Sequence, residues 1–95
     1  MDMHLTDNVA VVTGGASGIG RAVAVGLLAE GAAVAIWDIA GTVRTVADEL
    51  APGGGPAAVG FEVDITDQDS VERALEQTIE ALGPIDHLVH CAAIG

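Results

Sequence analysis

Short runs of consecutive apolar residues alternate along this chain with segments in which apolar residues recur every three or four positions. The apolar runs cover residues 8–13, 33–38, 57–63 and 87–91. Runs of this length are typical of strands that are buried on both faces of a sheet. The sequence therefore predicts four short strands, of which the first two are candidates for burial on both faces.

Three helices are predicted between these strands. The first extends from Gly18 to Gly31, a residue type that commonly follows a helix, and the third ends at Leu82. The second is amphipathic, because its apolar residues have the spacing i, i+3, i+4 and i+7. These residues are Val43, Val46, Ala47 and Leu50. On the opposite side of this helix, Arg44 and Asp48 are predicted to form an i, i+4 ion pair.

The predicted order β-α-β-α-β-α-β requires a parallel sheet with right-handed connections. Such connections give the strand order 3-2-1-4 and carry the third helix to the opposite face from the first two. The predicted fold class is therefore α/β, as part of a doubly wound parallel sheet. The glycine- and proline-rich segment 52–56 is predicted to be a surface loop within one domain.

A glycine-rich loop is the first candidate for chemistry. The first strand and the first helix are joined by Thr13-Gly14-Gly15-Ala16-Ser17-Gly18-Ile19-Gly20. Gly14 would allow a sharp turn, Gly18 would let the backbone approach a pyrophosphate, and Gly20 would permit close packing of helix and strand. Glycine-rich turns also occur simply to join a strand to a helix. The strand before this loop and the helix N-terminus after it nevertheless favour a dinucleotide site.

Two aspartates follow predicted strands. Asp38 ends the second strand, where a carboxylate can accept hydrogen bonds from an adenosine ribose. The alternative for Asp38 is a solvated carboxylate, since the chain has fourteen acidic residues. Asp64 follows the third strand and could cap the turn into the third helix, with Thr66 or Asp67 as the helix N-cap.

The glycine loop resembles the TGxxxGxG motif of the short-chain dehydrogenase/reductase family, matched here by Thr13, Gly14, Gly18 and Gly20. The resemblance covers essentially the whole chain and implies a Rossmann-type fold. It also implies an NAD cofactor and, in a complete relative, hydride transfer between the nicotinamide and a carbonyl or a secondary alcohol. Asp64 matches the acid that contacts the adenine amino group in this family. The expected cofactor-binding residues are Gly14, Ser17, Gly18, Ile19, Gly20, Asp38, Asp64, Ile65 and Ala92.

The chain departs from the family pattern in two respects. The usual NNAG turn after the fourth strand is replaced by His90-Cys91-Ala92-Ala93, in which Ala92 alone matches. The Tyr-x-x-x-Lys pair, which relays a proton in the family together with a serine, has no counterpart, because the chain contains no tyrosine and no lysine. We therefore assign no catalytic residue and expect no dehydrogenase turnover from this chain by itself.

These observations lead us to interpret residues 1–95 as the truncated N-terminal, NAD-binding half of a single Rossmann-fold domain. Two other interpretations stay open. The first is a non-catalytic module that binds a nucleotide or a partner. The second is a truncated product without a function of its own. The substrate cannot be read from these residues.

Composition restricts the partners. Three arginines oppose fourteen acidic residues, which gives a formal net charge of -11. Nucleic-acid phosphates and acidic membrane surfaces both require clustered cations, so neither is an expected partner. The chain has one cysteine, Cys91, and its first residues lack the pattern of a signal peptide. We therefore expect a cytoplasmic protein.

The fourth predicted strand raises two further questions. His87 and His90 are three residues apart, so their side chains would point to opposite faces of the strand and could not share a metal ion. We therefore expect no metal site. The same strand would expose a mostly apolar edge, which could lead to self-association of the chain.

Overall fold

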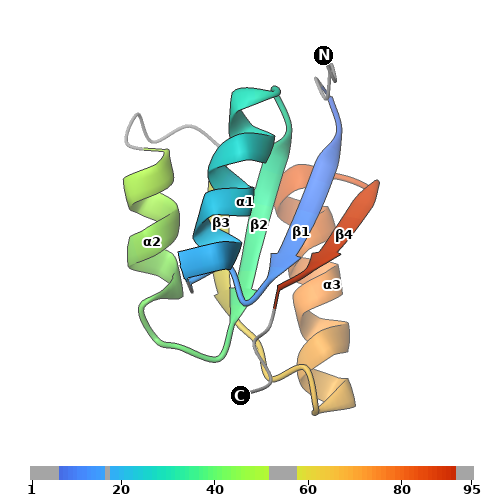
Figure 1. Cartoon of the computed structure of the whole chain (residues 1–95). Helices are drawn as coiled ribbons and strands as arrows, with labels where there is room; N and C mark the ends of the chain where they lie inside the picture. Colours follow the sequence, from blue (N-terminus) through green and yellow to red (C-terminus); the bar gives the residue numbers. More distant parts are fainter. Residues whose placement is uncertain (1–6, 17, 52–57, 92–95) are drawn as a thin grey trace.

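Four parallel strands and three helices form the part of the chain that the structure, a computed structural model, describes, namely residues 7–16, 18–51 and 58–91 (Figure 1). Their bounds are β1 (Val9–Thr13), α1 (Gly18–Ala29), β2 (Ala33–Asp38), α2 (Val43–Leu50), β3 (Ala58–Glu62), α3 (Gln68–Leu82) and β4 (His87–His90). Each predicted strand and helix overlaps one of these elements. Within the described ranges, no helix is long and apolar enough to cross a membrane.

The strand β1 lies in the middle of the sheet, paired with β2 on one side and with β4 on the other. The strand order is β3-β2-β1-β4 and all three pairings are parallel. Every residue of β1 is buried, whereas most residues of the edge strand β4 are exposed. The predicted α/β fold with strand order 3-2-1-4 is confirmed.

Alternate residues of β2 face different helical layers. Val34 and Ile36 belong to an apolar cluster with residues of α1 and α2, whereas Ala35 and Trp37 belong to a second cluster with Ala74 of α3. Figure 1 accordingly shows α1 and α2 on one side of the sheet and α3 on the other. The predicted passage of the third helix to the opposite face is confirmed, as right-handed connections require.

A glycine in β3 allows α2 to lie directly against the sheet. A Cβ atom added to Gly60 would come within 2.6 Å of the carbonyl oxygen of Val43, the first residue of α2. Because the obstacle is backbone, a side chain at this position would push α2 away from β3. The sequence analysis missed this requirement, since Gly60 lies inside a run of residues that simply suits a strand.

Hydrogen bonds to two side chains hold the start of the third helix in place. Asp67 is the N-cap of α3, and its carboxylate accepts hydrogen bonds from the backbone N–H groups of Asp69 at 3.0 Å and Ser70 at 3.5 Å. The Ser70 hydroxyl in turn accepts a hydrogen bond from the backbone N–H of Asp64 at 3.0 Å. Of the two predicted caps, the structure selects Asp67. The start of α3 is thereby tied to the end of β3.

The predicted ion pair on α2 is wrong in its partners. The ion pair in this region joins Arg21 of α1 to Glu49 of α2 at 2.6 Å, rather than Arg44 to Asp48. Arg21 and Glu49 lie 28 positions apart, so only the packing of the two helices brings them together. Both side chains are about half exposed, and such surface pairs contribute little to stability.

A buried hydrogen bond connects the sheet to α3. The indole N–H of Trp37 donates to the hydroxyl of Thr78 at 3.0 Å, and both residues are buried. An indole N–H has no other way to satisfy its hydrogen-bonding capacity once it is removed from water. Thr78 therefore has two roles on the buried face of α3: it packs in the core and it accepts the hydrogen bond of the Trp37 indole.

We predict that Thr78→Val lowers the free energy of unfolding by about 1–3 kcal/mol, because the indole N–H of Trp37 loses its buried acceptor. Denaturant titration followed by the fluorescence of Trp37, the one tryptophan of the chain, measures the change. Thr45→Val on the exposed side of α2 is the matched control and should leave stability within about 0.5 kcal/mol. Equal stability of the two variants would contradict this role of Thr78.

The outer edge of β4 has no strand paired with it among the described residues. Leu88 in this strand is 66% exposed, and the strand contains neither proline nor lysine to discourage pairing with another chain. We propose that this edge mediates self-association of the chain.

We therefore expect Leu88→Lys to shift the chain toward monomer in sedimentation velocity experiments, since a lysine on an edge strand opposes strand addition. Val25→Lys, an equally drastic change at an exposed position of α1, serves as the control for added charge. A chain that is monomeric throughout, or one that both variants affect equally, would show that β4 is not the associating edge.

Candidate functional site

The carboxyl ends of β1 and β2 hold the glycine-rich loop. The backbone N–H of Gly14 donates to the carbonyl oxygen of Trp37 at 2.7 Å, and that of Gly15 reaches the same oxygen at 3.4 Å. Gly14 has a φ of 71°, a left-handed conformation that favours glycine. The chain therefore makes the predicted sharp turn directly after β1 and is fixed to the end of β2.

Two glycines of this loop are required by close contacts within the protein. A Cβ atom at Gly20 would collide with the backbone of Gly14, the residue that directly follows β1. A Cβ atom at Gly15 would collide with the side chain of Ile36, one of the largest fully buried residues. The sequence analysis expected the close contact of Gly20 but attached no role to Gly15, although the pair Gly14-Gly15 was visible in the motif.

Gly18 differs from these glycines because no atom of the described residues explains it. It is the first residue of α1, and a Cβ atom added there would meet no heavy atom of the described residues within 4 Å. The N-terminus of a helix carries N–H groups without intrahelical partners and the positive end of the helix dipole. An open space of this kind fits the diphosphate of a dinucleotide, whose approach a side chain would hinder.

Asp38 connects the loop after β1 to the loop after β2. One carboxylate oxygen of Asp38 accepts from the backbone N–H of Ala16 at 3.0 Å, and the other accepts from the N–H of Ala40 at 3.1 Å. A carboxylate offers about four lone-pair positions, so these two bonds leave room for further donors. Asp38 is half-buried. It therefore places a negative charge beside the glycine loop while it also holds that loop in shape.

Asp64 is engaged in the turn that precedes α3. Its carboxylate accepts from the backbone N–H of Thr66 at 3.0 Å and from the Thr66 hydroxyl at 2.6 Å. The hydroxyl bond, followed by the backbone bond, lowers the pKa of Asp64. These two bonds stabilise the fold above the ordinary pKa of an aspartate, and their contribution is lost as the pH falls through the lowered value. The turn-capping interpretation of Asp64 therefore has direct support, and adenine binding stays a prediction.

Three isoleucines are exposed at the same edge of the sheet. Ile19 is 74% exposed in the first turn of α1, Ile39 is 72% exposed directly after Asp38, and Ile65 is 43% exposed directly after Asp64. The sequence analysis expected Ile19 and Ile65 in the site but not Ile39. The position of Ile39, directly after Asp38, could have indicated it. Ser17 and Ala92 lie outside the described residues, so their predicted roles stay predictions.

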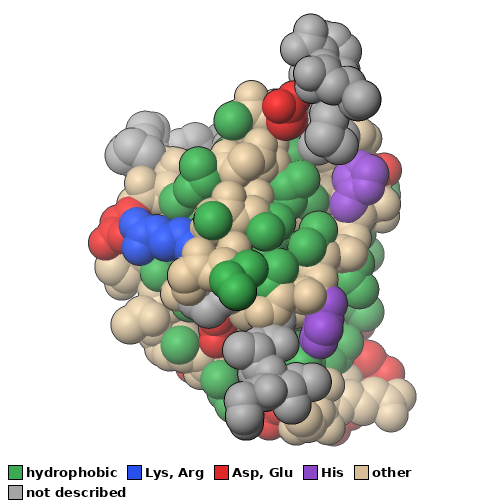
Figure 2. Space-filling model, viewed as in Figure 1, with side chains coloured by type: hydrophobic (Ala, Val, Ile, Leu, Met, Phe, Trp, Pro, Cys, Tyr) green, Lys and Arg blue, Asp and Glu red, His purple; other side chains and the backbone are tan. Residues whose placement is uncertain are grey.

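The ends of β1 and β4 meet in a polar contact that sequence reasoning did not find. The Thr13 hydroxyl oxygen lies 2.8 Å from Nδ1 of His90. The sequence analysis treated His90 as a possible metal ligand and as part of the segment that replaces the NNAG turn. In the described ranges, no three His, Cys, Asp or Glu side chains come together as a metal site. Figure 2 shows the described histidines apart from one another along the molecule. Register could have indicated the contact, because Thr13 and His90 are partners in the parallel pairing.

Comparison with known proteins agrees with this geometry. The family model described as short chain dehydrogenase matches residues 8–95. The chain belongs to the short-chain dehydrogenase family. This family consists of oxidoreductases that bind nicotinamide dinucleotides, which is the ligand class that the glycine loop predicts. The resemblance stated from the motif is therefore confirmed.

Individual relatives extend this result. The chain is 45% identical to the short-chain dehydrogenase fogB of Aspergillus ruber, over 98% of this chain and 36% of that protein. It is 43% identical to a sorbitol dehydrogenase of Cereibacter sphaeroides, over 97% of this chain and 35% of the relative. It is 37% identical to an NAD-dependent glycerol dehydrogenase of Listeria innocua, over 98% and 35%. The chain thus spans about a third of the length of the relatives it matches.

Gly20, which is in close contact with backbone, and Gly18, which faces open space, should respond differently to substitution. We expect Gly20→Ala to lower the free energy of unfolding by roughly 1–3 kcal/mol, because the new methyl group would be forced against backbone. Gly18→Ala should keep or slightly raise stability, since the space is open and alanine favours a helix. Chemical denaturation of both variants makes the comparison. Equal losses of stability would show that the difference between the two glycines is not real.

Proposed function

We propose that this chain is the NAD(H)-binding portion of a short-chain dehydrogenase that acts on a carbonyl or a secondary alcohol. The observation that carries the choice of NAD is the position of Asp38. Its carboxylate is bonded at 3.0 Å to the backbone of the glycine loop, so a negative charge lies where the adenosine ribose would enter. A 2′-phosphate on that ribose would be repelled.

The proposal gives each part of the loop a task in binding. The segment from Gly14 to Gly20 would hold the diphosphate at the N-terminus of α1, where Gly18 leaves the open space. Asp38 would accept hydrogen bonds from the ribose hydroxyl groups with its remaining lone pairs. Exposed apolar side chains beside the two aspartates, Ile39 and Ile65, would cover the faces of the adenine ring.

The bound cofactor would supply the hydride acceptor or donor, and this chain would bind and orient it. The printed names of two relatives, a sorbitol dehydrogenase and an NAD-dependent glycerol dehydrogenase, support an alcohol or the corresponding carbonyl compound as the substrate class. The second of these names also supports NAD as the cofactor.

We expect isothermal titration to give at least tenfold tighter binding of NAD than of NADP. Like charges 4 Å apart repel by up to about 4 kcal/mol at an effective dielectric of 20, before any relaxation. Asp38→Asn removes the charge and keeps one of the two oxygens that accept from backbone N–H groups, so it should bring the two affinities toward equality. The matched control Asp48→Asn removes a charge from the exposed side of α2 and should leave the preference unchanged.

Two results would contradict the proposal. Equal or tighter binding of NADP to the unmodified chain would refute the choice of NAD. Binding of neither dinucleotide by a folded chain would refute the cofactor site itself.

A further inference from the structure

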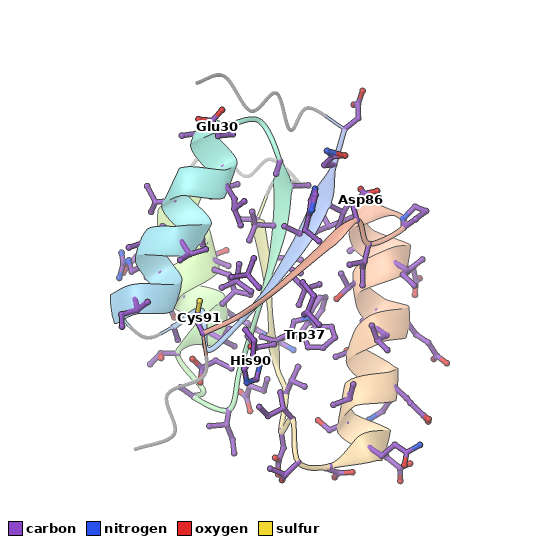
Figure 3. The ribbon with its side chains drawn as sticks, turned by 45° about the vertical axis from the view of Figure 1, so that its right-hand side comes forward. Glu30, Trp37, Asp86, His90 and Cys91 are labelled. Atoms are coloured by element: carbon purple, nitrogen blue, oxygen red, sulfur yellow. The ribbon has the colours of Figure 1, made fainter. Side chains whose placement is uncertain are left out.

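A row of four residues crosses the sheet at its carboxyl edge. Phe61, Trp37, Thr13 and His90 are successive register partners from β3 to β4. Trp37 and Phe61 pack in the cluster that includes α3, so Thr13 and His90 lie on the same face of the sheet. Along the row, Thr13 is 3% exposed and His90 is exposed. Figure 3 shows His90 at this end of β4, turned away from its neighbour Cys91.

The distances around the Thr13 hydroxyl favour one arrangement of its contact with His90. The Thr13 hydroxyl has two acceptors in reach, Nδ1 of His90 at 2.8 Å and the carbonyl oxygen of Val89 at 3.5 Å. The first distance is that of a good hydrogen bond and the second lies at the limit. The shorter distance favours the arrangement in which the hydroxyl donates to Nδ1 of the neutral ring, with the proton of the ring on Nε2. This tautomer is assigned from the two distances.

The same pair keeps its form when the ring is protonated. Nδ1 then donates to the hydroxyl oxygen of Thr13, and the hydroxyl hydrogen can turn to the carbonyl of Val89. In both of these arrangements Nε2 of His90 carries a hydrogen. Among the described residues Nε2 has no hydrogen-bond partner, and no carboxylate lies within ion-pair distance of the ring. An N–H donor at the end of β4 thus has no acceptor among the residues that the structure describes.

The strand order indicates what this donor faces. In open α/β sheets, ligands bind at the carboxyl ends of the strands, where successive connections leave in opposite directions. Here that point lies between β1 and β4, since β2 and β3 are on one side of β1 and β4 is on the other. If adenosine lies at Asp38 and the diphosphate at the loop after β1, as proposed above, the half of the dinucleotide beyond adenosine would continue toward β4.

We propose that Nε2–H of His90 donates a hydrogen bond to an oxygen of the bound dinucleotide beyond its adenosine part, and that Thr13 positions the ring for this contact. The acceptor is an oxygen of the diphosphate or of the second ribose. This inference rests on the proposed function of the chain, because it assumes that a dinucleotide occupies the site. It gives His90, which stands where the family motif has asparagine, a role of its own.

Two isosteric variants separate the two ring nitrogens. His90→Asn places its amide where Nδ1 lies, so it can keep the contact with Thr13 but has no group at the position of Nε2. His90→Gln places its amide near Nε2 and can replace the outward donor. His87→Asn, in the same strand and also exposed, is the matched control. Circular dichroism of each variant checks that the chain is folded.

Affinities for AMP, ADP, ADP-ribose and NAD locate the contact. We expect His90→Asn to weaken binding of NAD and ADP-ribose about tenfold and to leave AMP binding unchanged, whereas His90→Gln recovers most of the loss. A loss that begins with ADP identifies a diphosphate oxygen, and a loss that begins only with ADP-ribose identifies the ribose. His87→Asn should bind all four ligands like the unmodified chain.

Three outcomes overturn the inference. The first is equal NAD affinity of His90→Asn and the unmodified chain. The second is an equal loss for AMP, which would indicate a general structural effect. The third is a loss in His90→Asn that His90→Gln does not recover. If the unmodified chain binds AMP and NAD poorly alike, the proposed function itself fails, and that result is distinct from the first three.

Discussion

The pairing of β1 with β2 on one side and β4 on the other is the constraint on which the rest of the structure depends. Every residue of β1 is buried, so both of its hydrogen-bonding edges and both of its faces must be covered by other elements. The parallel register brings the ends of three strands to one edge. The glycine loop lies between the end of β2 at Asp38 and the end of β4 at His90 because Thr13 aligns with Trp37 and His90.

Trp37 connects this edge to both layers of the fold. Its backbone carbonyl accepts hydrogen bonds from the glycine loop, and its indole N–H donates to Thr78 on α3. The backbone thus fixes the turn after β1, and the side chain fixes the helix on the opposite face. Most other buried apolar side chains are valine and alanine. In such a core, neighbouring segments lie close together where glycine removes a Cβ atom, as at Gly15 and Gly60, because tightly packed small side chains cannot move aside.

The candidate site combines local structure with binding capacity in the same groups. Asp38 and Asp64 both use their carboxylates to hold backbone N–H groups of nearby loops. Each keeps further lone pairs for a ligand. Gly18 contributes in a different way, because it leaves open the space that a side chain would fill. The candidate site is therefore largely formed without a ligand, which would reduce the ordering that binding requires.

The sequence by itself determined the elements, their order and the position of the glycine loop. Apolar periodicity is a local property, so β2 and α2 have the bounds that their patterns predict, and right-handed connections then leave one strand order. The tertiary structure alone decided the side-chain partners. Thr13 meets His90 across 77 positions, Trp37 meets Thr78 across 41, and Arg21 meets Glu49 across 28. Such contacts depend on strand register and on the distance between packed helices, and neither quantity is encoded in the spacing of residues along a single segment.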